Sequence, residues 1–314
     1  MPSHRGSSPA DRVVRHTLAD GTVREYRYPR GRKQKREHAP DSLAAMIDAY
    51  RISPEWRGLR DSTRINYAIY LRPLEEMGHI LAAAVRRKDI MTLRDAIAEA
   101  RGNGAATGFV RAASALFGWA VDREWVTHSP VARVKTLPGG HLRAWTEGEA
   151  NQAEAELPPH LARVVTLARY TGQRRTDLCR MGWSAYDGRA IRLVQQKTGA
   201  PLVIPCHPKL KAALDEWPRI ATTILTDQSG RPWKPEYLSH ALPAALPAIG
   251  LSNEINVHGL RKLAATALAE AGCSVREIAA VTGHQTLAMV QLYTDSVDQQ
   301  KLAAAAIVRL SGRK

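Results

Sequence analysis

Residues 171–178 read Thr171-Gly-Gln-Arg-Arg-Thr-Asp-Leu178, and this stretch decides how the rest of the chain is interpreted. Gly172 interrupts a helical pattern, so one helix is predicted to end there and another to begin directly after it. We expect Arg174 in the first turn of the new helix, three residues before Asp177. Adjacent arginines are common on the surface of so basic a chain. Whether Arg174 and Arg175 have a function must therefore be judged together with the other motifs of the sequence.

Other segments of the C-terminal half place titratable side chains in distinctive contexts. Lys197-Thr-Gly-Ala200 forms a predicted turn between two strand-like runs. His258-Gly-Leu-Arg261 puts an imidazole and a guanidinium three residues apart, on one helix face. Gly283-His284 follows a predicted helix end, and Tyr293 comes nine residues after the histidine. Each segment alone has an ordinary structural explanation, whereas the ordered set is improbable by chance.

The charge of the chain indicates what kind of partner it binds. The length of 314 residues is enough for roughly two domains. Lys and Arg number 45 against 30 Asp and Glu, which gives a formal net charge of +15. This balance predicts a polyanionic partner, with nucleic acid ahead of an anionic membrane surface. No apolar run approaches the ~20 residues of a membrane-spanning helix, and the N-terminus lacks the apolar core of a signal peptide.

Several common catalytic signatures are missing from the sequence. It contains no Walker A motif, dinucleotide-binding glycine motif, zinc-protease motif or serine-hydrolase elbow. Paired carboxylates of the kind a two-metal nuclease needs are not evident either. The three cysteines have neither metal-knuckle nor disulfide-framework spacing, which is typical of buried thiols in a reducing compartment. We therefore expect neither a metal nor a cofactor.

Residues 1–38 form a predicted unit of their own. Strand-like runs at 13–19 and 22–28 flank Asp20-Gly21, which is a two-residue hairpin signal. The basic residues that follow the hairpin are Arg30, Arg32, Lys33, Lys35 and Arg36. They are consistent with a DNA-contacting arm, a solvated linker or a localisation signal.

The rest of the chain is predicted to be mainly α, with a small β-hairpin or sheet. Residues 41–128 show helical periodicity throughout, and prolines and glycines mark 129–144 as a linker. Within 145–314, capping boxes predict helices that begin after Thr146 and Ser274. A last predicted helix, at 297–310, either packs on its own domain or docks into a neighbouring protomer.

The motifs together resemble those of the tyrosine recombinases, the phage integrase family. The resemblance rests on Thr171–Leu178, Lys197–Gly199, His258–Arg261, Gly283-His284 and Tyr293, which follow the order and spacing of the family. It covers about residues 41–310. It implies a helical, SAM-like core-binding domain that contacts DNA at 41–128, and a tyrosine-recombinase catalytic domain with a C-terminal helix at 145–314. Residues 1–38 resemble, more weakly, the arm-binding extension of some integrases.

The resemblance implies a role for each matching residue. Arg174 and Arg261 would clamp the non-bridging oxygens of a DNA phosphate with fork-shaped donors that stay protonated. Tyr293 would be the nucleophile, and Lys197 would protonate the leaving 5′-oxygen.

The remaining matching residues are implied to assist these groups. His258 would move a proton to or from the tyrosine and contact the phosphate, and His284 would donate a hydrogen bond to a non-bridging oxygen. Asp177 would orient the side chains of Arg174 and His258, without binding a metal.

Three positions depart from the family pattern. Gln173 and Arg175 stand where the family more often has apolar residues. If the helix starts one residue late, Arg175 becomes the alternative clamp, although the spacing to Asp177 favours Arg174. Lys262 is also unusual and is expected to add a phosphate contact.

The implied function is site-specific recombination of double-stranded DNA, as by the integrase of a mobile element. The enzyme would act through a 3′-phosphotyrosyl link and a Holliday junction, without metal or ATP. It would form a dimer on each site and a tetramer in the synapse, with possible accessory DNA-bending or directionality proteins, in the bacterial cytoplasm at the nucleoid. Two alternatives stay open: a non-catalytic DNA-binding accessory protein on the same scaffold, and an enzyme like type IB topoisomerases.

Overall fold

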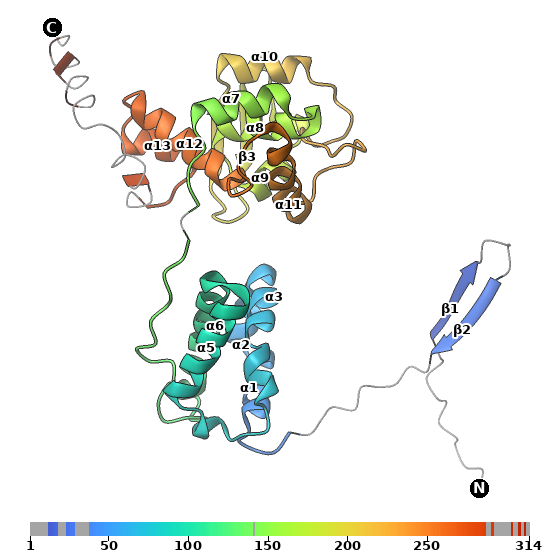
Figure 1. The fold of residues 1–314 in the computed structure, drawn as a ribbon, viewed down its shortest axis with the longest axis vertical. Helices are drawn as coiled ribbons and strands as arrows, with labels where there is room; N and C mark the ends of the chain where they lie inside the picture. The colour runs from blue at the N-terminus through green and yellow to red at the C-terminus, as the bar shows by residue number, and fades with distance from the viewer. Residues whose placement is uncertain are drawn as a thin grey trace. The chain divides into compact units, whose positions relative to one another are not determined.

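The computed structural model describes residues 12–17, 23–28, 38–140, 142–286 and 290–291, with isolated positions at 303, 307, 308 and 311. The chain divides into two compact units, Met1–Gly140 and His141–Lys314 (Figure 1). Tyr293, the basic residues at 30–36 and most of the helix predicted at 297–310 lie outside the described residues. No helix in the described part is both long and apolar enough to cross a membrane.

The first unit begins with an antiparallel hairpin of β1 (Arg12–Thr17) and β2 (Val23–Tyr28), in which Thr17 lies opposite Val23. The predicted two-residue turn at Asp20-Gly21 lies outside the described residues.

Helices form the remainder of the first unit: α1 (Leu43–Ile52), α2 (Pro54–Gly58), α3 (Asp61–Tyr70), α4 (Arg72–Glu76), η1 (Ala82–Ala84), α5 (Arg87–Arg101) and α6 (Asn103–Asp122). The apolar faces of α1 and α6 are buried in one core, within the region 41–128 that was predicted to be helical. Gly102 takes a left-handed φ of 82° between α5 and α6, so this single residue separates the two helices. Asn103 donates to the Pro138 carbonyl at 2.8 Å, which holds the segment after α6 against this unit.

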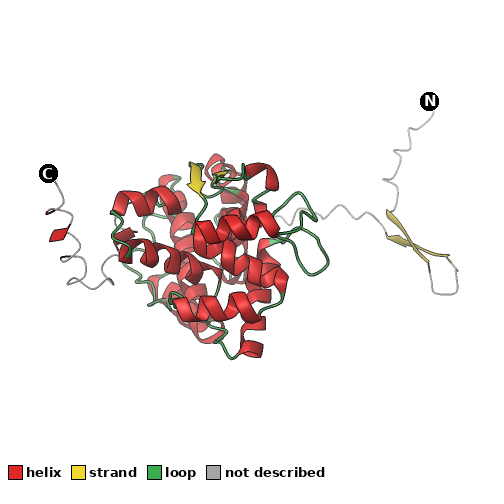
Figure 2. Ribbon diagram, turned by 90° about the horizontal axis from the view of Figure 1, so that it is seen from above, coloured by secondary structure: helices red, strands yellow, loops and turns green. Residues whose placement is uncertain are grey.

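The second unit contains α7 (Glu147–Glu156), α8 (Pro159–Thr171), α9 (Arg175–Arg180), η2 (Trp183–Ala185), β3 (Ala190–Val194), β4 (Pro201–Pro205), α10 (Pro208–Glu216), α11 (Pro235–Ala245), η3 (Leu246–Ile249), α12 (Val257–Glu270) and α13 (Val275–Thr282). β3 and β4 pair as an antiparallel hairpin, with Ile191 opposite Ile204. Figure 2 shows how strongly helices predominate over strands. The predicted fold class, mainly α with a small sheet, is confirmed.

Local signals determine where the helices of the second unit begin and end. Thr146 caps α7 by accepting from the Glu149 N–H at 3.1 Å, and Ser274 caps α13 in the same way. Both predicted capping boxes are therefore present. Gly172 ends α8 and Gly283 ends α13, each in the left-handed conformation that glycine adopts without strain. These two helix ends lie at the candidate site.

Trp145 fixes the start of α12. Its side chain is 2% exposed, and its indole N–H donates to the Asn256 carbonyl at 2.8 Å. Gly259, in the first turn of α12, faces this indole so closely that a Cβ there would lie 2.7 Å from Trp145 Cδ1 and 2.8 Å from the Arg143 carbonyl. Only glycine lets the helix that carries His258 and Arg261 approach this segment.

The close packing at Gly259 predicts opposite effects for two Gly→Ala substitutions within helices. Gly259→Ala should lower the free energy of unfolding of the second unit by about 1–3 kcal/mol, because the backbone carbonyl cannot yield. Gly118→Ala in α6 has nothing within 4 Å of the new Cβ. It should raise the stability of the first unit by roughly 0.5–1 kcal/mol through helix propensity. Urea unfolding of both variants measures the difference, and a stabilising Gly259→Ala would contradict the packing argument.

Candidate active site

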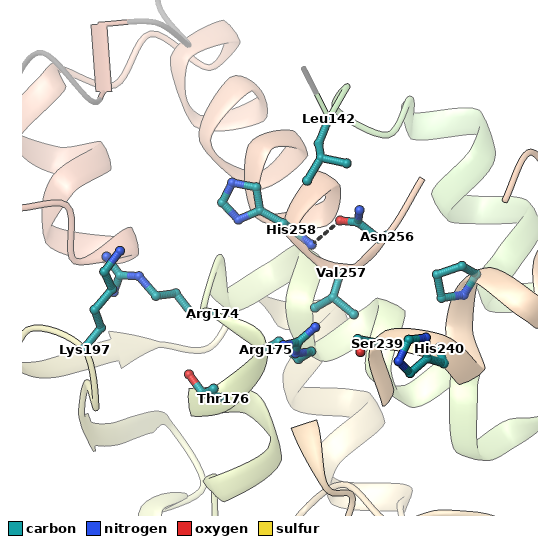
Figure 3. Close-up of a pocket in the computed structure, with 11 residues that line it drawn as sticks. Leu142, Arg174, Arg175, Thr176, Lys197, Ser239, His240, Asn256, Val257 and His258 are labelled. Carbon is teal, nitrogen blue, oxygen red and sulfur yellow. Dashed lines mark hydrogen bonds between the residues drawn. The ribbon is translucent and has the colours of Figure 1, made fainter. Parts of the chain in front are cut away.

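A pocket of about 570 Å³ brings together several of the predicted residues (Figure 3). Its lining consists of Leu142, Arg174, Arg175, Thr176, Lys197, Ser239, His240, Pro243, Asn256, Val257 and His258. Arg174 comes from the start of α9, Lys197 from the β3–β4 turn and His258 from the first turn of α12. None of these lining residues is acidic, so the described wall of the pocket is positively charged and suited to an anion.

Arg174 is the N-cap of α9 and does not lie in its first turn as predicted. The helix begins one residue later, at Arg175, and Gln173 just before it is fully buried. The guanidinium of Arg174 is directed away from the helix, and its Nη1 donates to Gln195 Oε1 at 2.6 Å. In Figure 3 it extends to the same side of the pocket as Lys197.

Arg175 lies on the other side of the pocket, with Ser239 and His240 (Figure 3). It is half-buried, and its Nε has no hydrogen-bond partner among the described residues. The sequence predicts Arg175 as the alternative phosphate clamp if the helix starts one residue late, and α9 does start at Arg175. Burial and Arg261 lower the pKa of both candidate histidines first, and of the two adjacent arginines it is the charge of Arg174 that lowers both further. This electrostatic coupling favours Arg174 as the partner of His258 and His284.

Arg261 is buried behind the pocket, at 1% exposure. Its Nη1 donates to the Gly172 carbonyl at 2.7 Å and to the Thr282 carbonyl at 2.6 Å. These carbonyls stand at the C-terminal ends of α8 and α13, where the helix dipole is negative. Two helix ends therefore stabilise a buried cation and fix its position.

The two candidate histidines are held in their neutral form. Burial, followed by the charges of Arg261 and Arg174, lowers the pKa of His284 to about 4. Desolvation and the nearby Arg261 and Lys262 also lower the pKa of His258. The Thr282 hydroxyl donates to the Ile278 carbonyl, so the 2.7 Å contact with His284 Nδ1 requires the proton to be on that nitrogen.

The predicted role of Asp177 is not what the structure shows. Asp177 Oδ1 accepts from the backbone N–H of Gln196 at 2.8 Å, and Oδ2 has no hydrogen-bond partner in the described part of the chain. The carboxylate bonds to neither Arg174 nor His258, because it lies in the first turn of α9 and faces the β3–β4 turn. Asp177 thus holds the turn that carries Lys197.

Lys262 does not point freely to a ligand either. Its ammonium donates to the Leu142 carbonyl, on the segment that leads to Trp145. The expected phosphate contact therefore competes with an internal bond. The side chain is half-buried and ties α12 to that segment.

Sequence reasoning missed the buried glutamines beside the site. Gln173 and Gln195 are both fully buried, and Gln195 Nε2 donates to Gln173 Oε1 at 2.7 Å. The sequence identifies Gln173 only as a polar residue at a position that is usually apolar. This departure was the available signal of a buried hydrogen bond, but it does not reveal the partner, which lies 22 residues away in the sequence.

Comparison with known proteins gives consistent results. The model of the Phage integrase family matches residues 149–300. The integrase of Escherichia phage HK022 is 28% identical over 273 residues, covering 81% of this chain and 76% of the relative. Tyrosine recombinase XerC of Mycobacterium bovis (strain BCG / Pasteur 1173P2) is 30% identical over 256 residues, covering 72% and 86%.

Solved structures show the same relationship. A lambda integrase dimer bound to a COC′ core site has a TM-score of 0.71 at 25% identity, over 82% of this chain and 97% of that one. The Tn1549 transposon integrase shares the fold, with a TM-score of 0.68 at 15% identity, over 84% and 99%. The chain belongs to the phage integrase family, the tyrosine recombinases, as the motifs predicted.

The geometry around His284 predicts how the second unit responds to pH. The unfolded histidine titrates near 6.5 and the folded one near 4, so between these values the unfolded state binds more protons. Stability should therefore fall as the pH drops from 6.5 to 4, by on the order of 3 kcal/mol from this residue. Urea unfolding over this range should show a smaller loss for His284→Asn. An NMR titration midpoint at or above 6.5 for His284 would contradict the assignment.

Proposed function

We propose that this chain is a site-specific DNA recombinase that cuts and rejoins strands through a covalent 3′-phosphotyrosyl intermediate at Tyr293. One observation carries the proposal: Arg174, Lys197 and His258 line one pocket that has no acidic residue in its described wall, in a chain of the tyrosine recombinase family. The separate segments of the sequence meet where an anion with a reactive phosphorus would sit.

Electrostatic stabilisation is the proposed task of the two arginines. The transition state of phosphodiester cleavage places extra negative charge on the non-bridging oxygens. Arg174 and Arg261 provide guanidiniums that stay charged and are already oriented by hydrogen bonds. Fixed cations of this kind supply the charge neutralisation that other nucleases obtain from metal ions.

Proton transfers are assigned to the remaining groups. Tyr293 attacks phosphorus, and the 5′-oxygen leaves with a proton from Lys197. Neutral His258 is the form that can accept the proton of the tyrosine. The link to tyrosine conserves the energy of the broken bond, so religation needs no ATP.

The proposed role of His284 depends on its protonation state. Its Nδ1–H is directed to Thr282, so donation to a phosphate requires a second proton on Nε2. A bound phosphate favours that protonation by placing negative charge beside the ring. We therefore assign the phosphate contact of His284 to the DNA-bound state.

The likeness to a lambda integrase dimer on a core site supports the proposed partners. We propose that the helical unit before Gly140 and the second unit both contact double-stranded DNA, with a dimer on each site and a tetramer in the synapse. The basic residues Arg30 to Arg36 are proposed as an additional DNA-binding arm. Accessory DNA-bending or directionality proteins and a location at the nucleoid complete the proposal.

A covalent adduct assay tests the proposed nucleophile. Duplex DNA selected from a randomised pool for tight binding is nicked near each position in turn, so that cleavage traps the enzyme on the strand. The wild type should give a protease-sensitive adduct on denaturing gels, and Tyr293→Phe should give none. Tyr237→Phe is the matched control, because Tyr237 is an exposed tyrosine on α11. An adduct that survives in Tyr293→Phe would overturn the assignment.

The same assay separates the two candidate clamps. Arg174→Ala should slow adduct formation by about 10²–10³-fold, the usual cost of one lost donor to a developing oxyanion. Arg175→Ala should weaken DNA binding with a much smaller effect on the rate at saturating DNA. A larger loss of rate at Arg175 would transfer the role to that residue.

A further inference from the structure

The amide of Gln195 lies between the residues that carry the proposed chemistry. Gln195 follows β3 directly and is 0% exposed. Its Oε1 accepts from Arg174 Nη1 at 2.6 Å and from the Thr198 hydroxyl at 2.9 Å. Its Nε2 donates to Gln173 Oε1 at 2.7 Å and to the Thr282 carbonyl at 2.9 Å. A glutamine amide offers two donors and two acceptor positions, and here all four are used.

The partners determine which way this amide faces. A guanidinium can only donate, so Arg174 must meet the oxygen of Gln195. A backbone carbonyl can only accept, so the Thr282 carbonyl must meet the nitrogen. The two ends of the amide are therefore not interchangeable, and neither a carboxylate nor an apolar side chain reproduces them.

The four bonds of Gln195 join several parts of the site. Thr198 is adjacent to Lys197 in the β3–β4 turn, so the amide holds that turn as well as Arg174. The carbonyl of Thr282 also accepts from Arg261, and its hydroxyl meets His284. The neutral amide of Gln195 thus links Arg174 to the turn that carries Lys197. Through Thr282 it also links Arg174 to Arg261 and His284.

The amide of Gln195 packs directly against Gly283. A Cβ at Gly283 would come within 2.5 Å of Gln195 Cδ, and Gly283 has a left-handed φ of 71°. The end of α13 therefore accepts the amide only because residue 283 is glycine.

We propose that Gln195 is a positioning residue for the recombination reaction, acting by fixing the guanidinium of Arg174. The inference rests on the proposed function. An arginine on a flexible stem loses orientational freedom on meeting the phosphate, unless the protein has already oriented it. A neutral amide orients the guanidinium while leaving its full charge for the phosphate, whereas a carboxylate would pair with that charge.

The test compares isosteric variants under single-turnover conditions in the adduct assay. Gln195→Met keeps the length of the side chain and removes all four bonds, and should slow adduct formation by about 10²-fold while DNA affinity changes less than about threefold. Gln195→Glu keeps the acceptor but adds a charge that pairs with Arg174, and should also be slow. Gln196→Met is the matched control, because Gln196 is the exposed neighbour and its hydrogen bond to Asp177 comes from the backbone N–H, which the substitution keeps.

A second substrate distinguishes positioning from mere structural support. A methylphosphonate at the cleavage position removes one negative charge from the non-bridging oxygens, so an oriented guanidinium contributes less. The ratio of wild-type to Gln195→Met rates should therefore shrink at least tenfold on this substrate. A thermal melt checks that each variant is folded, and Gln195→Glu carries the test if the methionine variant is not.

The outcomes separate this inference from the proposed function. Equal rates for wild type and both Gln195 variants would overturn the inference and leave the function standing. An unchanged ratio on the methylphosphonate would also overturn it, because the loss would then be general. Failure of the wild type to form any adduct on the nicked series would overturn the proposed function and the inference with it.

Discussion

The buried guanidinium of Arg261 is the constraint on which the rest of the site depends. Removing a cation from water costs several kcal/mol unless strong acceptors replace the lost hydration. Here the acceptors are the carbonyls of Gly172 and Thr282, at the C-terminal ends of α8 and α13. The three helices must therefore keep their mutual positions for the charge to stay buried. The loop that presents Arg174 and the segment that contains His284 follow directly from those two helix ends.

The positive charges of the site are brought together without acidic partners in the described wall of the pocket. Burial is the first cause of the lowered pKa of His258 and of His284, and repulsion from the charges of Arg261 and Arg174 lowers both further. A bound phosphate removes that repulsion. The same arrangement that strains the free protein therefore favours the DNA complex.

Much of the fold and part of the site could be predicted from the sequence, because both rest on local rules. Helical periodicity predicted the helices within 41–128, α1 and α6 among them, and Thr146 and Ser274 marked helix starts through bonds spanning three residues. The order of the motifs predicted that Arg174, Lys197 and His258 belong to one site, and all three line one pocket. The bond that Arg174 donates to Gln195 and the bond that Asp177 accepts from Gln196 could not be predicted, because each joins residues about 20 apart in the sequence. The roles of Tyr293 and of the basic arm stay predictions.

The contact between Gly283 and Gln195 has a consequence for how sequences of this family can diverge. The two residues share one volume, so a larger side chain at position 283 is compatible only with a smaller one at 195. Loss of the glutamine would in turn remove the acceptor of Arg174 Nη1 and one of the two donors to the Thr282 carbonyl. Neutral drift at either position is therefore blocked, and change must pass through paired substitutions. In an alignment of relatives, the residues at positions 195 and 283 would then be expected to vary together.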